Sequence, residues 1–574
     1  MKRIVCLILV AVMLALALAS CGKRKTDPAA TTAVKATAAE ATAGDSASAT
    51  AEQTTAEETT ANKWEIYGPE VSGYAEAART FRIKLDSSVS SEKTSKNDVY
   101  LVGPDEVAEG VTPTIQQMVY QRNKNAEALL GVKPEYTYLD KGWGQQQSQI
   151  QTYVQGAAAD APDLFVNMIY DLGKATLNAC FKDIWSIPGS YFDWDVKGWM
   201  KDWMETMSFT GDRAYILAGD YFVDILRAFG VLPFNLAMME ANVEKLAPAL
   251  LGEEIDNGEE LAPRFFDLVE EGYWTWELLG KLCEAIWQDT DNDEQNSIAD
   301  QLGIVADKYG GLTAALYIYS CGEELFETDK STDPGNPHYD RQWIYYPAEF
   351  DALGGIFDAV AAVYNGKGAL VTRGSSLDAS TPEDPGVAYH RIMFASGQIL
   401  TAGVCVLGAL EDDSFQSMTD VYSVVPLPKV SADKEYNTVI HNVGDAGAIN
   451  VNTNPAKARA LSAFLQYCTE NSGEIRQEFL EIVTKYKTTT YNQGTDRMLD
   501  IIYASVINAR DKAVEDTVGT DRRWHVIMKD GGSYKSTSAT LASAYEGAKT
   551  AKQNALDTIL TTWYGLPTVA SDGD

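Results

Sequence analysis

The chain has 574 residues, of which 45% are hydrophobic and 10% aromatic, so it can form several cores and is not wholly disordered. Asp and Glu number 81 against 47 Lys and Arg, and the formal net charge of −34 disfavours nucleic acid as a partner, because an acidic surface repels phosphate. The four His residues form no H-E-x-x-H motif, which argues against a histidine-rich metal enzyme.

Residues 1–20 are typical of a secretory signal, because Lys2 and Arg3 precede an apolar run over 4–19. The following Leu-Ala-Ser-Cys, ending at Cys21, is similar to the bacterial lipobox, in which the Cys thiol receives a diacylglyceryl group. We therefore expect a lipid anchor at Cys21 and a place on the extracellular face of the cell membrane, as in Gram-positive bacteria. An ordinary secretory peptide with an incidental Cys is the alternative.

A tether is predicted over residues 21–63. Its part from 26 to 62 is almost entirely Ala, Thr, Ser, Glu and Asp without aromatic residues, so it cannot bury enough apolar area to fold. No later apolar run reaches the length of a membrane span. Five later cysteines, an odd number without a C-x-x-C motif, are expected to be buried free thiols. They are Cys180, Cys283, Cys321, Cys405 and Cys468.

Strands and helices alternate in the first part of the folded region. Strands are predicted over 81–85, 99–102, 132–138 and 163–168, and helices over 114–130 and 145–156. This alternation predicts the α/β fold class, a sheet covered by helices. Later helices are predicted over 234–247, 276–287, 347–364, 456–469, 499–510 and 539–561, and later strands over 421–426 and 446–451.

Seven short segments, in order between about residues 95 and 510, together resemble the extracellular solute-binding lipoproteins of bacterial ABC importers (sugar-type family 1, large variant). They are 120–123 (YQRN), 161–165 (APDLF), 232–235 (LPFN), 273–278 (YWTWEL), 394–397 (FASG), 424–429 (VVPLPK) and 447–449 (GAI). Independently of the resemblance, Thr275 is placed to cap a helix, and Pro426 and Pro428 suit an extended hinge-adjacent segment because neither donates a backbone N–H.

The resemblance implies a two-lobed periplasmic-binding-protein-like fold (type II) with an interlobe cleft and a helix-rich second lobe. Lobe 1 would comprise 64–225 with 424–470, and lobe 2 would comprise 226–423 with 471–574. It implies a monomer that captures a carbohydrate, in this family an oligosaccharide, by lobe closure and delivers it to ABC permease subunits. It also implies that the protein is not an enzyme.

Candidate ligand residues are aromatic or polar side chains on loops at strand ends, since rings cover sugar C–H faces and Asp or Asn bonds hydroxyls. A structural role is the alternative for each. The candidates are Trp143, Tyr170, Asp171, Asp220, Tyr221, Trp343, Asn442 and Asp445.

The loop 289–300 predicts a structural calcium site, because Asp289, Asp291 and Asp293 alternate as in a calcium loop and Asp300 stands where a bidentate Glu is usual. A shifted register would use Asn292, Glu294, Asn296 and Asp300. A solvated acidic turn without any cofactor is the alternative.

Catalytic motifs are absent: the sequence has no P-loop, no G-x-G-x-x-G and no G-x-S-x-G. A secreted polysaccharide hydrolase, a binding protein for peptides or other solutes, and a surface adhesin remain alternative functions. A hydrolase would need two carboxylates facing each other across a groove.

Overall fold

The computed structural model describes residues 62–86, 96–103, 113–142, 145–156, 161–208, 210–307, 316–317, 319–321, 327–336, 339–345, 351–372, 389–403, 405–485, 491–506 and 538–565. They all belong to one unit, residues 61–574. The signal, Cys21, most of the tether and Trp143 lie outside the described residues. Within the described ranges, no helix is both long enough and apolar enough to cross a membrane.

The first sheet has the strand order β12-β3-β1-β2. Its strands are β1 (Thr80–Leu85), β2 (Lys133–Tyr138), β3 (Leu164–Met168) and β12 (Asp445–Ile449). β1 is parallel to β2 and β3, whereas β12 is antiparallel to β3. Every residue of β3 is buried, as expected for a central strand covered on both faces.

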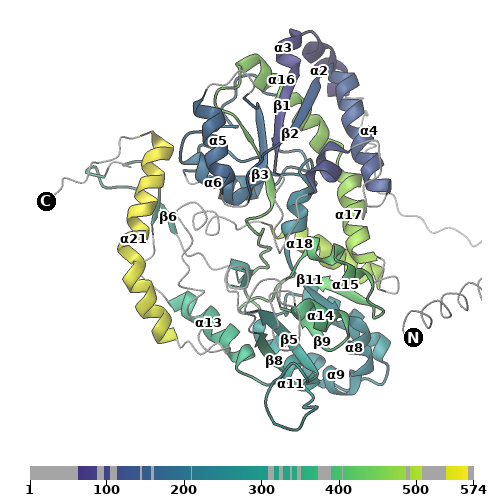
Figure 1. Ribbon diagram of the computed structural model, residues 1–574. Coiled ribbons are helices and arrows are strands. Elements are labelled where there is room, and N and C mark those ends of the chain that lie inside the picture. The colour runs from purple at the N-terminus through teal and green to yellow at the C-terminus, as the bar shows by residue number, and fades with distance from the viewer. Residues whose placement is uncertain are drawn as a thin grey trace, which may run out of the picture. The chain divides into compact units, whose positions relative to one another are not determined.

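Helices surround this sheet (Figure 1). They are α2 (Lys63–Ser72), α3 (Glu76–Arg79), the π-helical turn η1 (Asp98–Val102), α4 (Pro113–Leu130), α5 (Gln146–Gln155), α6 (Ile169–Thr176), α7 (Lys201–Thr206) and α16 (Pro455–Glu470). The helix α4 ends before Gly131, as the predicted range 114–130 implies, because this residue has φ +61° and a side chain there would meet Arg79.

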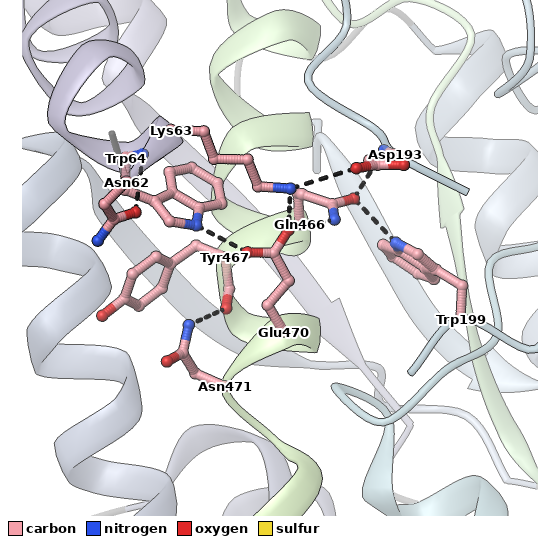
Figure 2. Close-up of polar contacts among 9 residues, drawn as sticks. All are labelled: Asn62, Lys63, Trp64, Asp193, Trp199, Gln466, Tyr467, Glu470 and Asn471. Atoms are coloured by element: carbon pink, nitrogen blue, oxygen red, sulfur yellow. Dashed lines mark hydrogen bonds and ion pairs between the residues drawn. The ribbon is translucent and has the colours of Figure 1, made fainter. Parts of the chain in front are cut away.

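The first helix is held on α16 by a buried tryptophan (Figure 2). Asn62 caps α2 by accepting a hydrogen bond from the Trp64 backbone N–H at 3.1 Å. The Trp64 indole donates to the Glu470 carboxylate at 2.7 Å, and Lys63 pairs with the other oxygen of Glu470 at 2.6 Å. The ring of Tyr467 stands edge-on to Trp64 at 5.2 Å. The start of the described region is thereby fixed to a helix from late in the chain.

We expect Trp64→Ala to lower the free energy of unfolding by about 3 kcal/mol, because it empties a buried indole site and removes the partner of Glu470. Urea denaturation followed by far-UV circular dichroism measures this loss. Ile66→Ala on the same helix is the control, since Ile66 is 62% exposed and its truncation should change stability little. Equal effects of the two substitutions would contradict the anchoring role.

The second sheet has the order β10-β4-β9-β5-β8, with β11 also paired to β4. Its strands are β4 (Gly230–Asn235), β5 (Leu302–Asp307), β8 (Ala369–Thr372), β9 (Ile399–Ala402), β10 (Cys405–Val406) and β11 (Tyr422–Val425). β5 is parallel to β8 and β9, whereas β4 is antiparallel to β9, β10 and β11. A separate antiparallel hairpin joins β6 (Glu327–Lys330) to β7 (Gln342–Tyr345).

The remaining described helices lie between or after these strands. They are η2 (Val223–Ala228), α8 (Leu236–Ala241), α9 (Val243–Leu251), η3 (Gly258–Glu260), α10 (Leu261–Glu270), α11 (Trp276–Ile286), α13 (Asp351–Tyr364), α14 (Tyr389–Ala395), η4 (Leu407–Glu411), α15 (Asp413–Gln416), α17 (Gly473–Lys485), α18 (Asn492–Ala504) and α21 (Ser538–Tyr564). The predicted cap of α11 is confirmed, because the Thr275 side chain accepts from the Leu278 backbone N–H.

The chain passes from one sheet to the other several times. η2 leads from the first-sheet region into β4, and residues 426–444 lead from β11 back to β12. Pro426 lies at the start of this return, where its carbonyl accepts from the Trp274 indole at 2.9 Å. The proposed boundaries between lobes within 61–574 stay a prediction.

The C-terminal helix α21 packs against elements from several parts of the chain. It packs on α13 and β7, and the Tyr564 hydroxyl donates to the Gln342 carbonyl at 2.7 Å. The adjacent Trp563 is only 5% exposed and stands edge-on to Tyr215 at 4.6 Å, beside α6 and α7 of the first-sheet region. Neighbouring residues of one helix therefore contact the β6–β7 hairpin and the region of α6 and α7.

The α/β class is confirmed by two mixed sheets with covering helices, and the five cysteines are buried, with no disulfide among the described residues, as predicted. Two predicted elements are wrong. Residues 99–102 belong to a helical turn, not a strand. Residues 234–247 are not one helix, because β4 continues to Asn235, whose side chain caps α8, and Asn242 separates α8 from α9.

Candidate functional site

Four of the eight predicted ligand residues gather at the carboxyl end of β3. Tyr170 and Asp171 lie in the first turn of α6, directly after β3, and Asn442 and Asp445 lie just before and at the start of β12. The β3–β12 pairing sets Asp445 opposite Met168. The Tyr170 backbone N–H donates to the Asn442 carbonyl at 3.1 Å. The antiparallel register thus brings together two segments that are far apart in the sequence.

Amide side chains extend this group toward the end of β1. Gln146, the first residue of α5, donates to Asp86 at 2.5 Å and accepts a hydrogen bond from Asn167 of β3. The neighbouring Gln147 backbone N–H donates to the Asp171 carboxylate at 3.2 Å. The sequence analysis missed Asp86, although it directly follows a predicted strand and the strand-end criterion could have found it.

Asn97 is a further missed residue of the group. Its side-chain amide donates to the Asp445 carboxylate at 2.7 Å, and both side chains are buried. No pattern in the sequence pointed to it, because it precedes the turn η1 that was predicted as a strand.

We call this set the β3-end group: Asp86, Asn97, Gln146, Asn167, Tyr170, Asp171, Asn442 and Asp445. Its carboxylates and amides offer acceptors and donors of the kind that bind hydroxyl groups. Tyr170 and Asn442 are the half-buried members, whereas Asp86, Asp171 and Asp445 are buried. The Lys174 ammonium lies 3.4 Å from the Tyr170 ring centre, so a cation already covers part of that ring. A solute could reach Tyr170 and Asn442 with the least rearrangement.

A cluster of largely buried charged residues is centred on Glu411 of η4. It neighbours the β3-end group through the adjacent residues Lys96 and Asn97. Arg227 of η2 donates to both Glu411 oxygens at 3.0 Å and to Asp224 at 2.8 Å. Lys96 also pairs with Glu411, and the Tyr100 hydroxyl donates to it at 2.9 Å. These five residues are the Glu411 cluster. It joins η1, η2 and η4 and compensates two buried carboxylates with two cations.

Opposing effects set the pKa of the Glu411 carboxyl. Burial alone raises this pKa, but the attraction of Arg227 and Lys96 outweighs burial, so the folded-state pKa is lowered from the ordinary 4.5. A lowered carboxyl pKa stabilises the fold above the unfolded-state pKa, and this contribution is lost as the pH falls through the folded-state value.

We therefore expect the free energy of unfolding of the wild type to fall more steeply below pH 4.5 than that of Glu411→Gln. At neutral pH, Glu411→Gln should be less stable by about 3 kcal/mol, because Lys96 and Arg227 both lose the Glu411 charge and Arg227 keeps only Asp224. Urea denaturation at a series of pH values measures both effects. Glu254→Gln at an exposed position is the control, and identical pH profiles for wild type and Glu411→Gln would refute this assignment.

Asp220 and Tyr221 were also predicted to bind ligand, but their side chains contact residues outside the β3-end group. One Asp220 oxygen accepts from Arg476 of α17 and the other from Tyr503 of α18, both at 2.7 Å. Burial raises the pKa of Asp220 despite the nearby Arg476. Tyr221 is fully buried, with the Arg122 guanidinium 4.8 Å from its ring centre. The structure thus gives both residues structural partners.

Trp343 is the one predicted tryptophan that lies within the described residues, and it belongs to a different element from the β3-end group. Trp343 is half-buried in β7, opposite Asp329 of β6. Trp143 lies outside the described residues.

The predicted calcium loop brings three of its four carboxylates together. One oxygen each from Asp289, Asp291 and Asp293 lie within 4.8 Å of one another. Asp300 is instead buried and accepts from the backbone N–H groups of Thr290 at 2.9 Å and Ser297 at 2.8 Å. Asp300 therefore holds the loop closed, and calcium binding stays a prediction.

A surface groove of about 590 Å³ lies in another part of the first-sheet region. Lys182, Asp183, Asp212, Arg213 and Tyr215 contribute its polar and aromatic lining. None of its lining residues is among the eight predicted ligand residues, so the groove and the β3-end group are different places.

No protein-family model matches the sequence, and no curated protein matches it. Among solved structures, the chain is similar to the GacH receptor of Streptomyces glaucescens, studied unliganded and with acarbose, at 13% identity and a TM-score of 0.46, covering 83% of this chain and 98% of that one. A family 1 extracellular solute-binding protein from Alicyclobacillus acidocaldarius has 12% identity, a TM-score of 0.44 and coverages of 83% and 98%.

The maltose/maltodextrin-binding domain of Bdellovibrio bacteriovorus, bound to maltotriose, has 12% identity and a TM-score of 0.38, with coverages of 85% of this chain and 99% of that one. Similarities this distant do not decide what the present chain binds.

Proposed function

We propose that this chain is a lipid-anchored extracellular solute-binding protein that captures a carbohydrate and delivers it to an ABC importer. The ordered motif series in the sequence supports the class. The two mixed sheets joined by several crossings agree with the two-lobed arrangement that this resemblance implies. The binding step makes and breaks no covalent bond, and closure of two lobes about a hinge holds the solute.

The observation that carries the proposal is the gathering of Tyr170, Asp171, Asn442 and Asp445 at the carboxyl end of β3. Ligands of open α/β sheets bind at the carboxyl ends of strands. This end also lies beside a crossing, because residues 426–444 return from the second sheet just before β12. A solute there would contact the segment that any rotation between the sheets must bend.

A carbohydrate fits the chemistry of this group. Its side chains are mostly amides, which are uncharged, and carboxylates. Both kinds exchange hydrogen bonds with hydroxyl groups, and Tyr170 offers an aromatic face for C–H groups. An anionic solute is disfavoured, because Asp86, Asp171 and Asp445 are buried together in this network.

Isothermal titration of the full chain against a glycan panel that includes acarbose and maltotriose tests the proposal. We expect saturable one-to-one binding without turnover. Tyr170→Ala should weaken that binding at least tenfold, about 1.4 kcal/mol, because it removes the partly exposed ring of the group. Tyr273→Ala is the matched control, since Tyr273 is 56% exposed and precedes α11 in the second-sheet region.

The same titration separates the alternatives. Chemical alteration of the glycan would indicate a hydrolase, and binding of peptides but no glycan would replace the carbohydrate assignment. Undiminished glycan affinity in Tyr170→Ala would indicate that the solute does not bind at the β3-end group.

The lipid anchor has a separate test. We expect the wild type to incorporate labelled palmitate and remain with the membrane fraction of a Gram-positive host, because lipidation of Cys21 supplies the anchor. Cys21→Ser should lose the label and appear in the medium. Cys180→Ser, at a buried thiol of the folded region, should keep both label and membrane attachment. Membrane retention of unlabelled Cys21→Ser would refute an anchor at this position.

A further inference from the structure

We propose that Lys96 and Asn97 link the β3-end group to the Glu411 cluster, so that a solute bound at Asp445 changes how firmly η4 is held. The effect of a solute rests on the proposed function. The link itself is a property of the unliganded chain and can be tested without any solute.

Two adjacent residues hold two different carboxylates. The Asn97 amide donates to Asp445 at 2.7 Å, and Lys96 pairs with Glu411. The Lys96 carbonyl accepts from the backbone N–H groups of Val99 and Tyr100 at 2.9 and 2.8 Å, so both residues belong to the first turn leading into η1. Because a hydrogen-bonded turn moves as a piece, a displacement of Asn97 also displaces Lys96 and Tyr100, which both bond Glu411.

The two carboxylates belong to different sheets. Asp445 begins β12 of the first sheet, whereas Glu411 ends η4, which directly follows β10 of the second sheet. The backbone N–H of Leu407, the first residue of η4, donates to the Phe229 carbonyl at 3.0 Å, next to β4. The link from Asp445 through Asn97 and Lys96 to Glu411 therefore crosses from one sheet's elements to the other's.

Competition for hydrogen bonds at Asp445 explains how a bound solute would affect the contacts of Glu411. The Asp445 oxygen used by Asn97 is a hydrogen-bond acceptor, so a solute hydroxyl that donates to this oxygen competes with that amide. A buried amide donor that loses an acceptor is unfavourable, so the turn that carries Asn97 shifts. Lys96 and Tyr100 then loosen from Glu411, while the two hydrogen bonds from Arg227 keep the carboxylate paired. The contact between η4 and the turn leading into η1 is thereby weakened, while Glu411 keeps Arg227 as its cation.

Hydrogen–deuterium exchange on the unliganded full chain tests the link. Asn97→Ala removes the hydrogen bond to Asp445. This hydrogen bond involves no residue of η4. We expect amide exchange in peptides covering 405–417 to become about threefold faster or more, because looser packing raises local opening. Lys96→Met, which removes a direct contact with Glu411, should have a similar effect on the same peptides.

Asn450→Ala is the matched control. Asn450 is also a buried amide, 2% exposed, and donates to the Pro162 carbonyl at 2.8 Å just beyond the other end of β12. It should leave exchange in 405–417 unchanged. If Asn97→Ala does not fold, Asp445→Asn weakens the same contact while keeping its shape.

Unchanged exchange in 405–417 for Asn97→Ala or Asp445→Asn would overturn the proposal, and so would equal acceleration by Asn450→Ala, which would indicate general destabilisation. Failure of the glycan titration alone would overturn the proposed function and leave the link standing.

Discussion

The antiparallel pairing of β3 with β12 is the constraint on which the candidate site depends. It is a non-local pairing, and it places the start of β12 against the end of β3, with Asp445 opposite Met168. A shift of one residue would move every side chain of β12 to the opposite face of the sheet. At Gly447 this register leaves no room for a side chain, because a Cβ would lie 2.4 Å from the Phe222 ring. Close packing and hydrogen bonding thus fix the same alignment.

A carboxylate that is removed from water needs compensating partners, and this explains why oppositely charged residues recur at the connections between the sheets. Both Glu411 and Asp220 are buried, and each is stabilised by an arginine and a tyrosine hydroxyl from other segments. The pKa of Glu411 is lowered, whereas that of Asp220 is raised, because the balance between burial and the nearby cations differs at the two places. Such groups favour particular pairings of segments more than they add net stability.

Local chemistry made part of the structure predictable. The alternation in 81–85 and the cap at Thr275 depend on near neighbours, and Tyr170 and Asp171 were found because they follow a buried strand. The apolar run 99–102 was predicted wrongly because the side chain of Asn123 in α4 binds the carbonyls at its end, a tertiary contact. Asn97 lies 348 residues from Asp445, so no local pattern could pair them.

The position of α21 bears on how the two sheets can move. Its final turn is shared, since Trp563 packs beside α6 and α7 while Tyr564 bonds β7. Because α21 also packs on α13, which contacts β8 of the second sheet, a large movement between the two sheets requires α21 to detach at one of its contacts. Detachment of a helix end is a local opening that costs less free energy than global unfolding. The freedom of the second sheet to move relative to the first would then depend in part on the packing of Trp563.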